Sequence, residues 1–209
     1  MPGSSQIFDH LTGQALLKAR KSGFPCFHFG DKLQCGNSFQ ERLGKAMQSL
    51  FDRGFESLVV IGNDSPDLRA ATLQKAATAV SVKRAVLGPA ADGGTYLIGM
   101  HRSQFDYDAF LKFPWRQAHL FRTMSRWLEK RCGANLLVLD CHMDMDSLED
   151  LKNWSARPVP NQRRLLSLIA GLLPDAPLRS GAFKAPPSKG AYPFIRFNKG
   201  SPLFTLRFS

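Results

Sequence analysis

The run Leu58-Val59-Val60-Ile61 constrains the fold more than any other feature of this sequence. It is continuously apolar and rich in β-branched residues, which is typical of a central strand covered on both faces. Helical patterns flank it. Residues 39–53 carry an apolar stripe at helical spacing, and residues 67–79 are rich in alanine. A buried strand between two such helices favours an α/β layered fold.

The same alternation continues along the chain. Further strands are predicted at residues 26–29, 85–87, 96–100 and 136–139, and further helices at residues 7–22, 117–131 and 161–172. A short helix opens at Ser147, where Asp150 stands three residues on, as in a capping box. Strands that alternate with helices predict an α/β layered sandwich with a mainly parallel sheet.

The composition changes after Trp154, so we predict an α/β domain over 1–154 and a basic, Pro-rich extension over 155–209. The net charge is +11, and the extension holds 9 of the 28 Lys and Arg residues but only one acid, Asp175. Such a tail is either a solvated extension or a segment that attracts nucleic acid, anionic lipid or phosphorylated ligands through its positive charge. Beyond its one helix we expect an extended arm within 192–208. The arm would lie on the body or on a second subunit, which would make a homodimer.

Several classes of protein are disfavoured by what the sequence lacks. It shows no signal peptide, no apolar run near the ~20 residues that span a bilayer, and no C-x-x-C pair typical of zinc sites. We therefore expect a cytoplasmic protein without a membrane span. No nucleic-acid-binding motif is present, which disfavours nucleic acid as a partner.

An acidic turn, Gly62-Asn63-Asp64-Ser65-Pro66-Asp67, follows the buried strand and precedes a helix. Ligands bind at the carboxyl ends of strands in open α/β sheets. Asp64 can there hold Mg²⁺ or Mn²⁺, which would bridge the phosphates of a nucleotide. Gly62 allows a close backbone approach. The alternative is that Asp64 or Asp67 caps the next helix.

Two more loops carry acids beside glycine or histidine. Gly88 to Tyr96 contains Asp92-Gly93-Gly94, which can expose amides to an anion or simply form a hairpin turn. Asp140 to Ser147 contains His142, Asp144 and Asp146. Either aspartate can supply a second metal ligand, whereas His142 is more often an ordinary loop histidine.

Two smaller features have open interpretations. Phe113-Pro114-Trp115 either lines a pocket or plugs the core. Arg42, next to Glu41, either grips a phosphate or forms a surface ion pair.

These motifs resemble, in their order, an uncharacterised bacterial glycosyltransferase-A-like family placed among the nucleotide-diphospho-sugar transferases. The matching blocks are Gln34-x-Gly36 with Glu41-Arg42-Leu43, Ile61 to Leu68, Leu87 to Gly99, Pro114-Trp115, and Asp144 to Leu151. The resemblance covers about residues 8–154. Its most specific parts are the G-x-D-x-P-x-L and G-P-A-x-D-G-G-x-Y-L-I-G blocks.

The resemblance implies a three-layer α/β/α sandwich with a mixed, mainly parallel sheet. It implies a divalent-metal ligand at Asp64, with Asp144 and Asp146 near the metal and Asp146 the better match, and it places Asp92, Gly93 and Gly94 on the substrate side. We predict Asp92 as the catalytic residue and Asp146 as the second metal ligand. The substrate-binding residues would be Arg42, Asn63, Gly93, Gly94 and Trp115.

One departure concerns the start of the chain. Such proteins usually begin with a strand and a basic loop of the kind K-x-P-x-x-G-x-x-K-T-R-L, which binds the nucleotide. Met1-Pro2-Gly3-Ser4-Ser5 leads directly into what resembles the family's first helix. We therefore expect a fold without that strand and loop, through either truncation or loss of ordinary nucleotide binding. A basic residue from elsewhere, such as the tail, can substitute.

The predicted function is a metal-dependent glycosyl or nucleotidyl transferase. Its donor would be a nucleotide sugar or nucleotide held through Mg²⁺ or Mn²⁺, and Asp92 would orient or deprotonate the acceptor. The alternative is a non-catalytic descendant of the same fold that serves as a binding or scaffold protein. A nucleic-acid binder working through the basic tail is a third, less favoured possibility.

Overall fold

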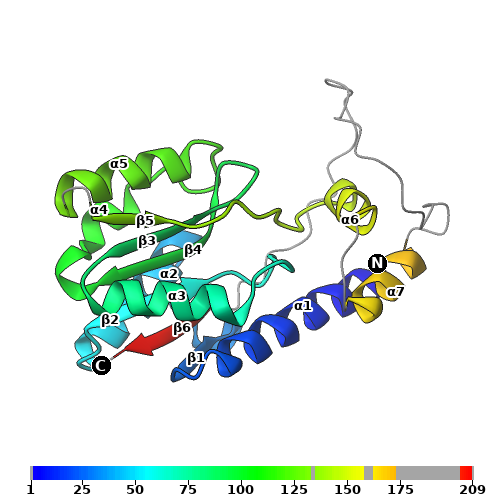
Figure 1. Cartoon of the computed structure of the whole chain (residues 1–209), viewed down its shortest axis with the longest axis horizontal. Coiled ribbons are helices and arrows are strands. Elements are labelled where there is room, and N and C mark those ends of the chain that lie inside the picture. The colour runs from blue at the N-terminus through cyan, green and yellow to red at the C-terminus, as the bar shows by residue number, and fades with distance from the viewer. Residues whose placement is uncertain (1, 133–134, 158–161, 173–202, 209) are drawn as a thin grey trace.

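A six-stranded sheet forms the centre of the described part of the chain (Figure 1). The structure is a computed structural model that describes residues 2–132, 135–157, 162–172 and 203–208. In sheet order the strands are β1 (Cys26–Phe29), β6 (Leu203–Phe208), β2 (Ser57–Ile61), β4 (Thr95–His101), β3 (Ala85–Pro89) and β5 (Leu136–Val138). The helices are α1 (Pro2–Lys21), α2 (Phe39–Asp52), α3 (Ala70–Ser81), α4 (Tyr107–Leu111), α5 (Leu120–Cys132), α6 (Leu148–Ser155) and α7 (Arg163–Leu172).

Alternate residues of β2 show that helices cover both faces of the sheet. Val59 and Ile61 lie in a buried cluster with residues of α1 and α3. Leu58 and Val60 lie in a second buried cluster with residues of α2, α4 and α5. Every residue of β2 is buried, as its continuous apolar run predicts. The three-layer α/β/α arrangement is confirmed.

The strand directions make the sheet mixed. β4 runs antiparallel to both β2 and β3, and β6 runs antiparallel to both β1 and β2. β1, β2, β3 and β5 therefore share one direction. In the described sheet, however, the sole pair of parallel neighbours is β3 with β5. The predicted mixed sheet is confirmed, but the insertion of β4 and β6 separates most of the strands that run in parallel.

Side-chain caps account for the starts of α2, α4 and α6. Ser38 caps α2 by accepting a hydrogen bond from the Glu41 N–H, and Ser147 with Asp150 forms the predicted capping box of α6. α3 begins at Ala70, three residues later than predicted. α4 was not predicted; Asp106 caps it by accepting from the Ala109 N–H.

Two elements of the predicted extension contact the body. α7 packs along α1 (Figure 1), and a third buried cluster joins α1, α6 and α7 around Trp154, Leu165 and Ile169. Residues 203–208 form β6, in which Thr205 is registered with Phe27 of β1 and with Val60 of β2. Residues 192–202 of the predicted arm lie outside the described residues. The division at 154 and the homodimer stay predictions.

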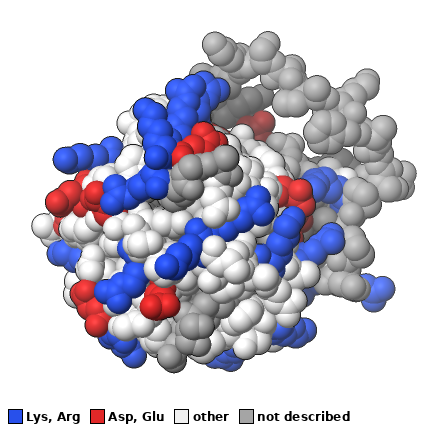
Figure 2. Space-filling view, turned by 60° about the vertical axis from the view of Figure 1, so that its left-hand side comes forward, with Lys and Arg blue, Asp and Glu red and all other residues white. Residues whose placement is uncertain are grey.

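Charged side chains of both signs lie interspersed on the face shown in Figure 2, where Lys and Arg predominate. Within the described residues, no helix combines the length and apolar character needed to cross a membrane.

Candidate functional site

Three loops that carry the predicted motifs meet at one edge of the sheet. The Met145 N–H donates to the Asp64 carbonyl (2.9 Å), which joins the loop after β5 to the acidic turn after β2. The His142 N–H donates to the Pro89 carbonyl (3.0 Å) at the end of β3. Because β2, β3 and β5 share one direction, their carboxyl ends lie together, where α/β proteins bind ligands.

These loops enclose one end of a cavity of about 130 Å³. The lining residues predicted from sequence are Asn63, Asp64, Asp92, Gly94 and Trp115, with Asp144 as the alternative metal ligand. The structure therefore brings these residues from distant parts of the sequence together in a single lining, with carboxylates from all three loops.

Another part of the lining is apolar and aromatic. Phe39, at the start of α2, meets the Trp115 ring edge-on with ring centroids 5.5 Å apart. Trp115 Nε1 donates to the Phe110 carbonyl (2.8 Å), which fixes the indole. Phe113 is 8% exposed and packs into the core. Both interpretations of the Phe-Pro-Trp segment thus hold, because Phe113 plugs the core while Trp115 lines the cavity.

Gly62 makes room for the Asp64 carboxylate. A Cβ added at Gly62 would lie 2.6 Å from Asp64 Oδ1, so a larger residue would displace the carboxylate. The alternative interpretation of Asp64 or Asp67 as a helix cap is wrong. The cap residue of α3 is Arg69, and no side chain provides a capping hydrogen bond there.

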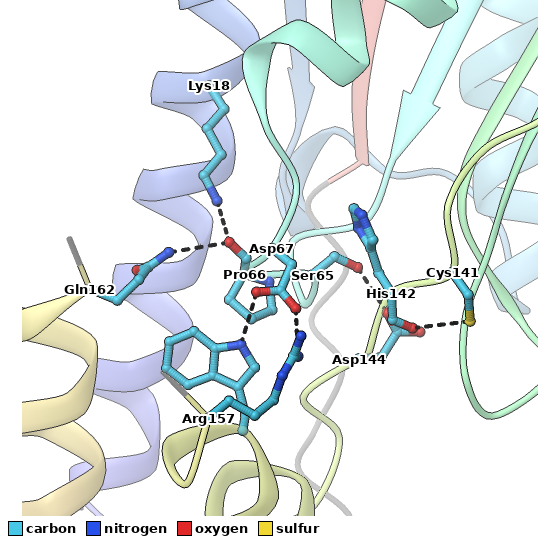
Figure 3. A network of polar contacts seen from close by, with 10 residues as sticks. Lys18, Ser65, Pro66, Asp67, Cys141, His142, Asp144, Arg157 and Gln162 are labelled. Atoms are coloured by element: carbon cyan, nitrogen blue, oxygen red, sulfur yellow. Dashed lines mark hydrogen bonds and ion pairs between the residues drawn. The ribbon is translucent and has the colours of Figure 1, made fainter. Parts of the chain in front are cut away.

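Asp67 anchors the acidic turn instead (Figure 3). Its carboxylate accepts hydrogen bonds from Arg157 (2.8 Å) and from the indole of the fully buried Trp154 (3.2 Å). The neighbouring Pro66 carbonyl accepts from Lys18 Nζ (2.7 Å) and from the Gln162 amide (3.3 Å). Residues from α1, from α6 and its C-terminal end, and from just before α7 therefore hold this turn in place.

Lys18 is a part of this anchor that the sequence analysis did not identify. Burial lowers the pKa of its amino group to about 8, although nearby Asp67 acts in the opposite direction. The residue belongs to an ordinary amphipathic helix and is partly buried, and nothing in its sequence neighbourhood indicates this burial.

Asp144 has a strongly perturbed carboxyl group. Burial and then the proximity of Asp64 raise its pKa to about 8, with smaller contributions from Asp92 and Asp146. The Ser65 hydroxyl donates to Asp144 Oδ1 (2.8 Å) and lowers the pKa in part. Negative charges thus converge here from all three loops, which a cation would stabilise.

The carboxylates fit a hard divalent cation. In the described chain, no three His, Cys, Asp or Glu side chains are grouped closely enough to hold a metal ion by themselves. Mg²⁺, however, is usually bound by one or two carboxylates together with substrate phosphates and water. Asp64 and Asp144, whose loops are bonded to each other, offer such a pair.

Asp146, the predicted second ligand, is not among the residues that line the cavity. Its backbone N–H donates to Asp150 Oδ2 (3.2 Å) within the cap of α6. It is near enough to contribute to the raised pKa of Asp144.

The Asp92-Gly93-Gly94 segment is the turn of the β3–β4 hairpin, so the hairpin interpretation is confirmed. Asp92 is exposed, and its Oδ1 accepts a hydrogen bond from the Gly94 N–H (2.8 Å). Gly93 has φ +87°, and a Cβ there would lie 1.8 Å from the Ala118 carbonyl oxygen. Gly93 is outside the lining, and it packs the hairpin against the loop that carries Trp115.

Two other candidate residues lie outside the lining. Arg42 is partly buried on α2, and its neighbour Glu41 accepts a hydrogen bond from the Asn37 N–H (3.0 Å). His142 stacks on Tyr96 with ring centroids 4.1 Å apart, and burial lowers its pKa. Its backbone bonds join β3 to the loop after β5, but its ring nitrogen Nδ1 is buried without a hydrogen-bond partner in the described part of the chain, so its polar groups are not all satisfied there.

The sequence analysis missed Arg116 and Gln117, which line the cavity next to Trp115. Arg116 has φ +64°, a left-handed conformation that is rare for residues other than glycine. A basic residue directly after Pro-Trp in a loop was the one available signal.

Comparisons with known proteins agree with this architecture. The chain resembles a crystal structure named "putative nucleotide-diphospho-sugar transferase" from Desulfovibrio desulfuricans G20, with 31% sequence identity and a TM-score of 0.59. The match covers 66% of this chain and 61% of that one, so the chain spans less than two thirds of that protein. A search of curated proteins found no match.

A family model matches residues 8–117, which include the acidic turn, the β3–β4 hairpin and Trp115. The predicted resemblance to an uncharacterised bacterial family of this fold is confirmed. Because that match spans more than half of its length, the chain belongs to the family described as "Uncharacterized protein conserved in bacteria (DUF2064)".

Proposed function

We propose that this protein is a metal-dependent glycosyl or nucleotidyl transferase acting on a nucleotide-diphosphate-type donor. The observation that supports it best is the convergence of Asp64, Asp92 and Asp144 on one cavity beside Trp115. The likeness to a protein named as a nucleotide-diphospho-sugar transferase supports the donor class.

Asp64 and Asp144 would hold Mg²⁺ or Mn²⁺. When bound, such an ion neutralises charge that develops on a diphosphate leaving group. The backbone bond between Met145 and Asp64 and the Ser65–Asp144 bond keep the two loops in register, so the pair is preorganised. Asp146 is the alternative partner of Asp64.

Asp92 would orient or deprotonate the acceptor hydroxyl. It is exposed at the cavity rim, and the Gly94 N–H fixes the direction of its carboxylate. Trp115 and Phe39 would provide an apolar surface for a ring of the ligand. The Asn63 amide donates to Thr12 Oγ1 (2.8 Å), which ties its orientation to α1.

The test is a thermal shift assay with a panel of nucleotide sugars, with and without Mn²⁺, followed by an assay for nucleotide release. A ligand present at 100 times its Kd stabilises the native state by about 2.7 kcal/mol. We expect a nucleotide sugar to stabilise the wild type only when Mn²⁺ is present. This stabilisation should be lost in Asp64→Asn and kept in Asp52→Asn. Asp52 is exposed at the opposite end of α2 from Phe39, so it serves as the control.

The variants Asp144→Asn and Asp146→Asn distinguish the two candidates for the second ligand. If Asp146→Asn keeps Mn²⁺-dependent binding and Asp144→Asn loses it, the result supports Asp144 as the second metal ligand. Binding without nucleotide release under any condition would favour the non-catalytic binding protein. No stabilisation by any nucleotide sugar at millimolar concentration would contradict the proposal.

A further inference from the structure

Arg116 occupies a conformation that its residue type disfavours. Its φ of +64° brings Cβ close to the following carbonyl, a clash that glycine avoids. In the described chain, Lys83, with φ +57°, is the one other non-glycine residue with positive φ. Lys83 lies in the turn between α3 and β3, at the sheet edge away from the cavity, whereas Arg116 lines the cavity.

The loop around Arg116 is held firmly on both sides. The Trp115 N–H donates to the Phe113 carbonyl (2.7 Å), and the Gln117 N–H donates to the Pro114 carbonyl (3.2 Å). Farther along, the Phe121 N–H donates to the Gly93 carbonyl (3.0 Å) of the hairpin turn. A strained residue persists when its surroundings over-determine it, and such residues gather at ligand sites.

The charge of Arg116 is distinctive within the cavity. The lining carries the carboxylates Asp64, Asp92 and Asp144, and Arg116 is its one Lys or Arg among the described residues. Its side chain is exposed at the rim. A guanidinium offers a planar set of donors that matches phosphate oxygens in pairs.

We propose that Arg116 forms an anion-binding subsite at the rim of the cavity, which takes the diphosphate of the donor. This inference rests on the proposed function and adds a cationic group that the protein itself supplies. The diphosphate would then lie between the carboxylate-bound cation and the guanidinium. The rigid loop explains why the strained conformation is kept at this position.

The test uses Arg116→Gly, because glycine adopts a positive φ without strain. Binding of UDP, GDP, ADP and CDP is measured by calorimetry in the presence of Mn²⁺, together with Tm. We expect Arg116→Gly to bind the preferred diphosphate about tenfold or more weakly, as for loss of a charge-assisted hydrogen bond, with an equal or higher Tm. Arg116→Lys, which keeps the charge, should lose less affinity.

Lys83→Gly is the matched control. It also relieves a positive φ, so its Tm should rise without any change in diphosphate affinity. If the wild-type protein and Arg116→Gly bind a diphosphate equally well, the proposed anion-binding subsite at Arg116 is wrong, whereas the proposed function stands. If the wild-type protein binds none of the four diphosphates with Mn²⁺, the proposed subsite is wrong. The proposed function is wrong as well if no nucleotide sugar stabilises the protein in the thermal shift assay.

Discussion

The hydroxyl of Ser65 donates a hydrogen bond of 2.8 Å to the carboxylate of Asp144, a residue 79 positions away in the chain. This bond joins the two acidic loops of the candidate site directly. It also partly offsets the burial and the nearby Asp64 that raise the pKa of Asp144 to about 8. The carboxyl group of Asp144 thus helps to join the two loops, although burial and nearby Asp64 disfavour its ionised form in the folded protein.

The first prediction concerns the pH dependence of stability in EDTA. The pKa of Asp144 is raised from 3.8 to about 8, so between these values the unfolded chain loses a proton that the folded protein keeps. Stability from this group is therefore lost as pH rises from about 4 to 8. Between pH 5 and pH 8, the Tm of both proteins is measured. The fall in Tm should be larger in the wild type than in Asp144→Asn, and the difference between the two falls should be about 2–4 °C or more.

Asp52→Asn is the control for this measurement, because Asp52 is exposed and far from the site. Parallel Tm–pH curves for the wild type and Asp144→Asn would contradict the raised pKa.

The second prediction concerns the anchor of the acidic turn. Asp67→Ala leaves the indole N–H of the fully buried Trp154 without its acceptor and also removes the ion pair with Arg157. An unsatisfied buried donor costs about 1–3 kcal/mol, so we expect a loss of about 2 kcal/mol in the free energy of unfolding. Urea denaturation measures it.

Arg157→Ala separates the two contributions. It removes only the partly exposed ion pair, which should contribute less than about 1 kcal/mol. Equal losses in Asp67→Ala and Arg157→Ala would show that the Trp154 bond is unimportant.

The third prediction concerns β6. Thr205 is registered with Val60 of β2 and Phe27 of β1, so Thr205→Pro disrupts a strand with neighbours on both sides. We expect a loss of about 2 kcal/mol in the free energy of unfolding, which for a protein of this size lowers Tm by about 5 °C or more. The uncovered strand edges should also make the variant prone to aggregation. Thr205→Val keeps the N–H and β-branching and should leave Tm nearly unchanged.

Size-exclusion chromatography of the same variants addresses the predicted homodimer. A wild-type dimer that dissociates in Thr205→Pro would indicate that the arm is exchanged between subunits. A Thr205→Pro protein as stable as Thr205→Val would contradict the position of β6 in the sheet.

The fourth prediction concerns the contact between the hairpin and the Trp115 loop. Gly93→Ala adds both strain at φ +87° and a clash with the Ala118 carbonyl. We expect a loss of more than about 2 kcal/mol in stability, and weaker ligand binding because the loop that carries Arg116 must shift.

Gly54→Ala is the matched control, since Gly54 has φ +91° but no atom within 4 Å of an added Cβ. It should show the cost of strain alone, about 1 kcal/mol, without any effect on binding. A similar loss in both variants would mean that the hairpin and the loop are not in close contact.

Local interactions explain what the sequence alone determined. The apolar run Leu58–Ile61 predicted a strand buried on both faces, and Ser147 with Asp150 predicted a helix start, because such patterns act within a few residues. The acidic turn, the Asp92 hairpin and Trp115 were identified as parts of one site because their order resembles a family. The family match confirms that resemblance, and Asn63, Asp64, Asp92, Gly94 and Trp115 do share a cavity.

Only the tertiary structure decided which side chains meet. The placement of β4 and β6 between parallel strands depends on pairing between distant segments, which no local pattern encodes. Asp144 and Asp146 are equivalent in sequence spacing, yet the bonds to Ser65 and Asp64 turn the Asp144 loop toward the cavity while Asp146 joins the cap of α6. Arg116 became a candidate only through its backbone conformation and its place in the lining of a cavity that also holds three carboxylates, because both depend on contacts that folding creates.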